Sequence, residues 1–237
     1  MDKFFLPDGY KINPVPITFD TEERSYWIRL RIRSSFVQQF AVYQWAATLI
    51  AGHNLRSIAD VGCGFAAKLA WLHSNLPDRD YWGIDQASAI ALCRSRFNFA
   101  HWLTVDLENN PATPPRKFDL VIVSDVIEHL ADPDLLLAYI KALVAPGGWI
   151  LLSTPDRHLV RGPDCAHSPN PYHVREWATD EFMSYIDSRG FDVVEHRLLP
   201  AVKISFTRAY LGDLWRVRLR GRRTMRYDLA ILARIKS

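Results

Sequence analysis

A short apolar run that ends in a glycine turn is the sequence feature that most constrains the fold. Ile58, Ala59 and Val61 are typical of a buried strand, and Gly62 and Gly64 break the run directly afterwards. Leucines at helical spacing follow, so a strand, a tight turn and a helix come in that order. A turn of this kind lets the backbone approach a ligand closely, although a lone glycine pair fits an ordinary turn equally well.

The alternation of strand and helix continues along the chain. Further strands are predicted at 81–84, 101–105, 118–124 and 149–153, with helices at 87–96 and after Asp132-Pro133. Repeated units of this length predict a doubly wound sheet, in which ligands bind beyond the carboxyl ends of the strands. Four acidic residues fall at those ends: Asp60, Asp85, Asp106 and Asp125.

The C-terminal part departs from this alternation. Thr179 is a candidate N-cap for a helix that stops at Gly190, and strands are predicted at 191–195 and 227–233. No crossover helix is required between these two strands, so the seventh is expected to be antiparallel, with an insertion at about 200–225. The predicted fold class is α/β, a Rossmann-like, doubly wound, seven-stranded sheet with an antiparallel last strand and helices on both faces.

The chain divides into two parts. Residues 1–52 hold a proline-rich arm and one or two helices that either pack on the sheet or form a lid over the ligand, and residues 53–237 form the main domain. The first residues lack a signal-peptide pattern and no apolar run has membrane-spanning length, which predicts a soluble, cytoplasmic protein. Three scattered cysteines argue against a disulfide framework and a structural zinc site.

From about Arg56 onward, the chain resembles class I S-adenosylmethionine-dependent methyltransferases. The resemblance rests on the glycine motif Asp60-Val-Gly62-Cys-Gly64, on acids after the second and third strands, on Ser124-Asp-Val-Ile-Glu-His-Leu130 and on Pro146-Gly147-Gly148. One departure is Ala66, which stands where the family usually has a third glycine.

The resemblance implies S-adenosylmethionine as the cofactor. Asp85 would accept hydrogen bonds from the ribose hydroxyls, and Asp106 one from the adenine amino group. The implied cofactor-binding residues are Asp60, Gly62, Cys63, Gly64, Asp85, Gln86, Asp106, Leu107 and Ser124. An NAD-binding oxidoreductase is a remote alternative, because no residues of the kind that cradle a pyrophosphate follow the glycines.

Proton removal from an acceptor hydroxyl would need a base next to the methyl group. His129 follows the fourth strand and is the first candidate, with Asp125 or Glu128 to orient its ring and His173 as a further catalytic candidate. The simpler interpretation is that Glu128 and His129 only cap and pack the next turn.

Metal binding is a second interpretation of the same residues. Asp125, Glu128 and His129 have the spacing found in ubiquinone-pathway O-methyltransferases and, with Glu for Asp, in small-RNA 3′-end methyltransferases, where a later histidine completes the site. His167 or His173 would have that place here, and oxygen ligands suit Mg²⁺ or Mn²⁺.

The segment after the fifth strand resembles methyltransferases that modify sugars or polysaccharide-linked acceptors. Its arginine, histidine and tryptophan residues suit a polar, ring-shaped acceptor. The expected substrate-binding residues are Arg157, Arg161, His167, His173, Arg175 and Trp177. The alternative is a structural loop that prolines and an Arg175–Glu176 pair hold in place.

Residues 203–226 are strongly basic, with Asp213 as their single acid. They form a solvated face, or bind an anionic membrane or a phosphorylated acceptor; RNA is a weaker option because no RNA-binding module is recognised. The expected activity is O-methylation of a hydroxyl on a sugar, a glycan-linked acceptor or a natural product. The alternatives are a metal-dependent RNA 3′-end 2′-O-methyltransferase, a small-molecule N-methyltransferase and a non-catalytic binding protein.

Overall fold

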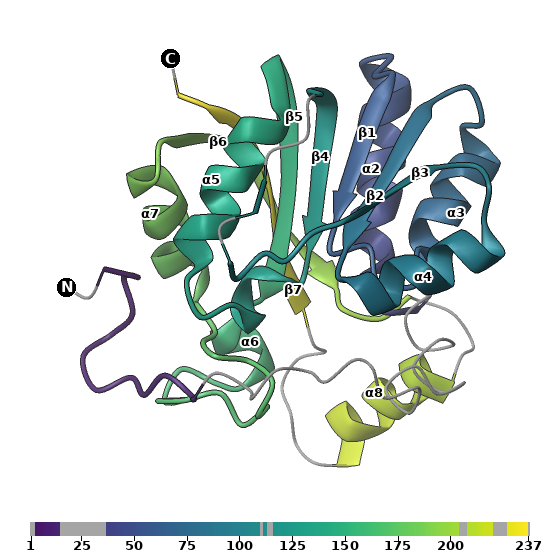
Figure 1. Cartoon of the computed structure of the whole chain (residues 1–237). Coiled ribbons are helices and arrows are strands. Elements are labelled where there is room, and N and C mark those ends of the chain that lie inside the picture. The colour runs from purple at the N-terminus through teal and green to yellow at the C-terminus, as the bar shows by residue number, and fades with distance from the viewer. Residues whose placement is uncertain are drawn as a thin grey trace.

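A seven-stranded sheet forms the centre of the molecule (Figure 1). The computed structural model describes residues 3–14, 37–109, 111–112, 116–203, 208–219 and 227–236. The strands are β1 Ser57–Val61, β2 Asp80–Asp85, β3 His101–Thr104, β4 Phe118–Ser124, β5 Val144–Pro155, β6 Phe191–Pro200 and β7 Tyr227–Ile235. Their order in the sheet is β3-β2-β1-β4-β5-β7-β6.

The direction of the strands confirms the predicted fold class. The pairs formed by β1 to β5 are all parallel, whereas β7 runs antiparallel to both β5 and β6. Of the seven strands of this sheet, only β7 runs in the opposite direction. The carboxyl ends of β1 to β6 therefore lie at one edge of the sheet. That edge is where the candidate site lies.

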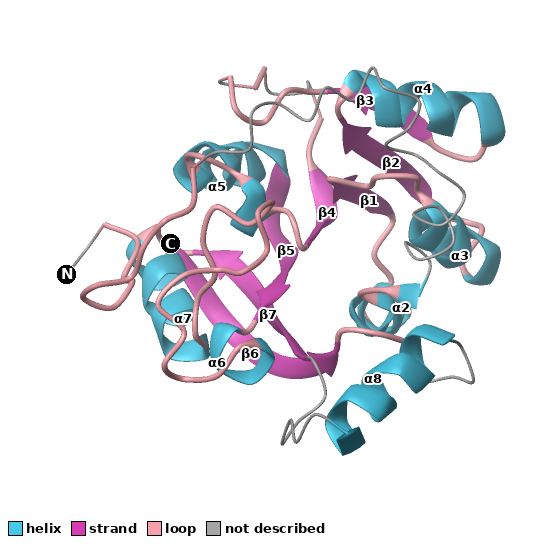
Figure 2. Ribbon diagram, turned by 90° about the horizontal axis from the view of Figure 1, so that it is seen from below, coloured by secondary structure: helices cyan, strands magenta, loops and turns pink. Residues whose placement is uncertain are grey.

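Helices cover both faces of the sheet (Figure 2). They are α2 Phe40–Gly52, α3 Ala67–Asn75, α4 Ala87–Arg96, α5 Pro133–Leu143, α6 Arg157–Val160, α7 Thr179–Ser188 and α8 Arg208–Leu219, with a 3₁₀ turn η1 at Ile127–His129. Buried apolar side chains of α5 and α7 form one core on one face. Those of α2, α3 and α4 form a second core on the other face, as expected of a doubly wound sheet.

Local sequence signals explain where two helices begin. The side chain of Asp132 accepts a hydrogen bond from Asp134 N at 3.1 Å, and Pro133 is the first residue of α5, as predicted. In α7, Glu181 accepts from Ala178 N at 2.9 Å, which makes Ala178 the N-cap. The prediction of Thr179 as the cap is therefore off by one residue.

Two boundaries differ from the predictions for a physical reason. β5 begins at Val144, directly after α5, and includes Pro146-Gly147-Gly148, whereas the predicted strand starts after these residues, at 149. Phe118 pairs with Val144 and Leu120 with Trp149, so an irregularity in the register accommodates these extra residues. β6 extends to Pro200 because its whole length pairs with β7.

The N-terminal arm, residues 3–14, lies against the loop that follows β5. Lys11 N donates to Ala166 O at 2.7 Å, and Asn13 N donates to Val174 O at 2.9 Å. Of the helices expected before the first strand, α2 is present, and the rest of that segment, 15–36, lies outside the described residues. Within the described part of the chain, no helix combines the length and the apolar character needed to span a membrane.

Candidate functional site

The glycine turn after β1 is closely packed. Gly62 has φ +76°, and a Cβ atom there would lie 2.3 Å from Cγ2 of Val126, which precedes η1. Gly64 also has a positive φ, of 54°. Ala66 has φ 55° although it carries a side chain, and it is the N-cap of α3. The turn therefore keeps the left-handed conformation of a third glycine even though alanine replaces it.

Asp85 holds this turn in place from the end of β2. Its Oδ2 accepts a hydrogen bond from Gly64 N, and its Oδ1 one from Gln86 N, both at 2.7 Å. Burial raises the pKa of Asp85. Each carboxylate oxygen can accept a further hydrogen bond, so the group can both order the turn and bind the hydroxyls of a ligand.

The other predicted cofactor residues lie in the turn itself and at the carboxyl ends of β3 and β4. Asp106 is exposed and accepts hydrogen bonds from Glu108 N at 2.9 Å and from Asn109 Nδ2 at 2.6 Å, while Leu107 packs against the core. Cys63 is buried, and it is a free thiol like the other two cysteines. Ser124 Oγ lies 3.0 Å from Ser153 Oγ on the neighbouring strand.

Asp60 lies beneath the turn and is 1% exposed. The hydroxyl of Tyr43 donates to its two carboxylate oxygens, at 2.9 and 3.0 Å. Burial raises the pKa of Asp60 to about 7, although the hydrogen bond from Tyr43 and the charge of Lys68 oppose the rise. Asp60 is thus a buried residue at the end of β1, and its carboxyl group is already hydrogen-bonded to protein.

A cavity of about 360 Å³ opens beside the carboxyl ends of β4 and β5. Acids, histidines and amides dominate its polar lining: Gln38, Gln39, Asp125, Glu128, His129, Arg161, Asn170, His173 and Asp228. A volume of this size suits a small molecule or the end of a larger acceptor.

Two residues with left-handed backbones meet at this cavity. Asp125 has φ 54° and Gln39 has φ 51°, and neither is glycine. Gln39 Nε2 donates to Asp125 Oδ2 at 2.9 Å, and Ser153 Oγ donates to Asp125 Oδ1 at 2.8 Å. Strained backbones of this kind cost about 1–3 kcal/mol each and concentrate at functional sites.

Glu128 comes from η1 and lies at the base of the cavity. Its side chain is 1% exposed, and Thr154 Oγ1 donates to its Oε2 at 3.2 Å. Its Oε1 accepts no hydrogen bond from the part of the chain that the structure describes. Burial, followed by the charge of Asp125, raises the pKa of Glu128 well above its usual value. This carboxylate oxygen therefore lacks the partner that a buried acceptor normally has.

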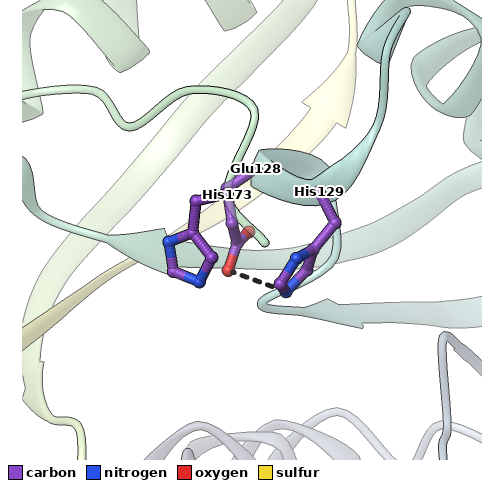
Figure 3. Close-up of side chains that lie close together, drawn as sticks. All are labelled: Glu128, His129 and His173. Carbon is purple, nitrogen blue, oxygen red and sulfur yellow. Dashed lines mark ion pairs between the residues drawn. The ribbon is translucent and has the colours of Figure 1, made fainter. Parts of the chain in front are cut away.

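Two histidines flank this carboxylate (Figure 3). His129 Nδ1 lies 2.7 Å from the carbonyl oxygen of Tyr172, so that nitrogen must be the donor, and Nε2 of His129 lies 3.8 Å from Glu128 Oε1. His173 Nδ1 lies 2.6 Å from Glu176 Oε1. The ligand atoms of Glu128, His129 and His173 lie within 4.8 Å of one another.

The charge of the His129 ring follows from its surroundings. Burial lowers the pKa of His129 to about 4, and His173 adds to the effect, so His129 is neutral at physiological pH. Burial raises the pKa of Glu176, but the hydrogen bonds from His173 and Arg161 outweigh this and hold the pKa at about 2. A neutral imidazole whose Nδ1 is the donor offers Nε2 as an acceptor or a metal ligand.

The structure places three of the predicted substrate residues in the interior of the protein. Arg157, Arg175 and Trp177 are at most 2% exposed. Arg157 pairs with Glu181, Arg175 donates to the carbonyls of Leu130 and Ala131, and Trp177 Nε1 donates to Phe4 O. These side chains have protein partners in the interior, which favours the alternative interpretation, a structural loop.

The remaining predicted substrate residues separate into two groups. Arg161 and His173 line the cavity, where both bind the carboxylate of Glu176. His167 is exposed and is not among the residues that line the cavity. Of the two later histidines considered for a metal site, His173 is therefore the one near Glu128 and His129. Asp125 is not part of that cluster.

Sequence reasoning missed several residues of the cavity. Gln39 precedes α2 with no pattern to mark it, and Asn170 and Tyr172 belong to a loop without periodicity. Asp228 had a usable signal, because it is a single acid in the apolar run of β7 and is 2% exposed. A buried charge inside a strand generally has a structural or functional partner.

Comparisons with known proteins find similarity to methyltransferases. Residues 59–150 match the family model described as a methyltransferase domain. A probable S-adenosylmethionine-dependent methyltransferase of Mycolicibacterium smegmatis is 29% identical over 195 residues, which cover 79% of this chain and 69% of that protein. A ubiquinone biosynthesis O-methyltransferase of Paraburkholderia phytofirmans is 28% identical over 112 residues, 44% of this chain, and the match spans less than half of the relative, 46%.

The fold is also that of solved methyltransferases. The plantazolicin methyltransferase BamL, crystallised with a triazolic desmethylPZN analog and SAH, superposes with a TM-score of 0.60 at 18% identity, covering 90% of this chain and 89% of that one. At this identity the likeness shows the fold alone. Together, the matched domain model and the sequence relatives support the prediction that the chain is a class I S-adenosylmethionine-dependent methyltransferase.

Proposed function

We propose that the chain transfers a methyl group from S-adenosylmethionine to a hydroxyl oxygen of a sugar, a glycan-linked acceptor or a natural product. The observation that carries the proposal is the cluster of Glu128, His129 and His173 in a cavity at the carboxyl edge of the sheet. An oxygen acceptor must lose a proton when it is methylated, and this cluster offers acceptor atoms for that proton.

The residues of the turn fit the cofactor. Gly62 and Gly64 give the turn the left-handed backbone that a tight cofactor-binding turn needs, and Asp85 retains acceptor capacity for the ribose hydroxyls. Asp106, which is exposed after β3, would accept from the adenine amino group. When it is bound, S-adenosylmethionine supplies an electrophilic methyl group.

His129 has the geometry of a general base. Its Nδ1 donates to the Tyr172 carbonyl, which fixes the ring, and its neutral form presents Nε2 toward Glu128. The remaining residues of the cavity, with Arg161 held by Glu176, would orient a polar acceptor. An acceptor bound in this cavity is held in a fixed orientation, and this lowers the entropic part of the barrier to an in-line displacement.

A divalent cation fits the same cluster. Both histidines have their Nδ1 anchored, one to a carbonyl and one to a carboxylate, which is the usual support of metal-binding histidines. Glu128 Oε1 would supply an oxygen ligand. Two imidazoles and one carboxylate suit Mn²⁺ better than Mg²⁺. A cation there would acidify the acceptor hydroxyl, so that a weaker base suffices.

The first experiment tests the cofactor. The chain is titrated with S-adenosylhomocysteine in a calorimeter, with NADH as the control ligand, and the titration is repeated on Asp85→Ala. Binding of S-adenosylhomocysteine alone, weakened at least about tenfold by Asp85→Ala, supports the proposal, because two charge-assisted hydrogen bonds are lost. Binding of NADH instead would refute it.

The second experiment tests the reaction and the metal. Methyl transfer to sugars, phenolic natural products and short RNAs is measured with and without a chelator, and Mn²⁺ binding is measured directly by titration. His129→Gln should lower turnover by about a hundredfold or more. His167→Gln is the matched control, because His167 lies in the same region of sequence but outside the cluster. Equal turnover in the two variants would remove His129 from the mechanism, and unchanged turnover in the chelator would exclude the cation.

A further inference from the structure

α8 has an exposed apolar face. Leu211 is 47% exposed, Leu214 39% and Trp215 58%. These residues are three and four positions apart, so their side chains share one side of the helix. Three large apolar side chains on one exposed helical face are unusual for a surface that contacts only water, because exposure of apolar surface to water is unfavourable.

The charge of this region is opposite in sign to that of the rest of the chain. Residues 203–226 hold eight basic residues and one acid, an excess of seven positive charges. The whole chain has a net charge of +3, so all other residues together carry four negative charges. Arg208 and Arg218 are exposed at the two ends of α8 and flank the apolar side chains.

The helix lies at the end of the molecule that carries the candidate site. α8 is found below the sheet in Figure 1, at the same end as α6, which follows the carboxyl end of β5. Figure 2 also shows it at the edge of the molecule.

We infer that α8 binds the surface of an anionic phospholipid bilayer. Its exposed leucines and tryptophan enter the boundary between headgroups and acyl chains, and its arginines bind the lipid phosphates. This is the composition of helices that lie in the plane of a membrane surface. RNA is the less suitable partner, because exposed leucines gain little from a phosphate backbone, whereas they gain much from acyl chains.

The test is co-sedimentation with vesicles of phosphatidylcholine, with and without phosphatidylglycerol, followed by filter binding to single-stranded RNA. The full chain should bind the anionic vesicles at least about tenfold more tightly than the neutral ones, because each arginine near such a surface is worth about a fivefold change in affinity. The fluorescence of Trp215 should shift to the blue in the bound state, and the shift should be lost in Trp215→Phe.

Three variants separate the contributions. Leu211→Ser/Leu214→Ser/Trp215→Ser should lose vesicle binding, and Arg208→Gln/Arg218→Gln should weaken it by about twenty-fivefold. Leu198→Ser is the matched control, because Leu198 is 46% exposed on β6 and should bind as the parent does. Circular dichroism confirms that each variant is folded. Equal binding to both kinds of vesicle, unchanged binding by the triple serine variant, or binding to RNA alone would overturn the inference.

Discussion

Gly62→Ala tests how the glycine turn is built. The new methyl group would lie 2.3 Å from Cγ2 of Val126, well inside van der Waals contact, and the residue would keep φ +76°. A left-handed backbone costs a residue with a side chain about 1–2 kcal/mol, and overpacking costs about 1–3 kcal/mol more. Val126 is β-branched and stiff at χ1, so it cannot easily rotate away.

The two costs together predict a loss of about 2–5 kcal/mol in the free energy of unfolding. For a chain of this size that corresponds to a fall of roughly 10 °C in Tm, measured by circular dichroism. Calorimetric titration with S-adenosylhomocysteine on the same protein would show a weaker complex, because the turn must move to admit the methyl group.

The double variant Gly62→Ala/Val126→Ala separates the two costs. Removal of the Val126 methyl groups should restore the part that is due to the clash, about 1–3 kcal/mol, and leave the backbone cost in place. Val126→Ala alone supplies the fourth corner of the cycle. If the two substitutions are additive, Val126 does not close the turn and the packing argument fails.

Three further predictions concern the same region and the loop after β5. Ala66→Gly should raise the free energy of unfolding by about 1 kcal/mol in urea denaturation, because glycine relieves the left-handed backbone; a loss of stability would contradict this. The pKa of Asp60 in the folded state, about 7, lies above its ordinary value. The folded state therefore binds the carboxyl proton more tightly than the unfolded state does, and stability falls as the pH rises between about 4 and 7. Relative to Asp60→Asn, the free energy of unfolding of the parent should therefore fall by about 2.5 kcal/mol between pH 5 and pH 8. Parallel curves of unfolding free energy against pH for the two proteins would refute the raised pKa. Arg157→Ala should lower the free energy of unfolding by about 3–5 kcal/mol, because it leaves Glu181 without its buried partner. The double variant Arg157→Ala/Glu181→Gln should recover part of that stability, and both effects are measured as changes in Tm.

The order of elements was predictable because periodicity and capping act locally. α4 has the predicted bounds, and Asp132-Pro133 begins α5 as expected, since both signals depend on neighbouring residues alone. β5 was misjudged because its first residues are held by pairing with β4, a contact that sequence periodicity does not contain. Local patterns therefore predict elements better than they predict how far pairing extends.

The candidate site was predictable where it follows the ends of strands. Asp85 and Glu128 belong to turns that the topology places at one edge, so they could be named in advance. Arg157 and Trp177 looked like ligand-binding residues because of their chemical type, but type does not tell the direction in which a side chain points. Gln39 reaches the site through a left-handed backbone, and no residue pattern announces that conformation.

The contact between the N-terminal arm and the loop after β5 supports a loop whose residues Asn170, Tyr172 and His173 line the cavity. The side-chain amide of Asn13 donates to three carbonyls, those of Ser168, Asn170 and His173, at 2.9, 3.2 and 2.9 Å. Loss of this one side chain would release the loop that presents His173. A shortened protein that lacks residues 3–14 would thus keep every candidate catalytic side chain and still bind its acceptor poorly, so activity screens should use a protein that retains residues 3–14.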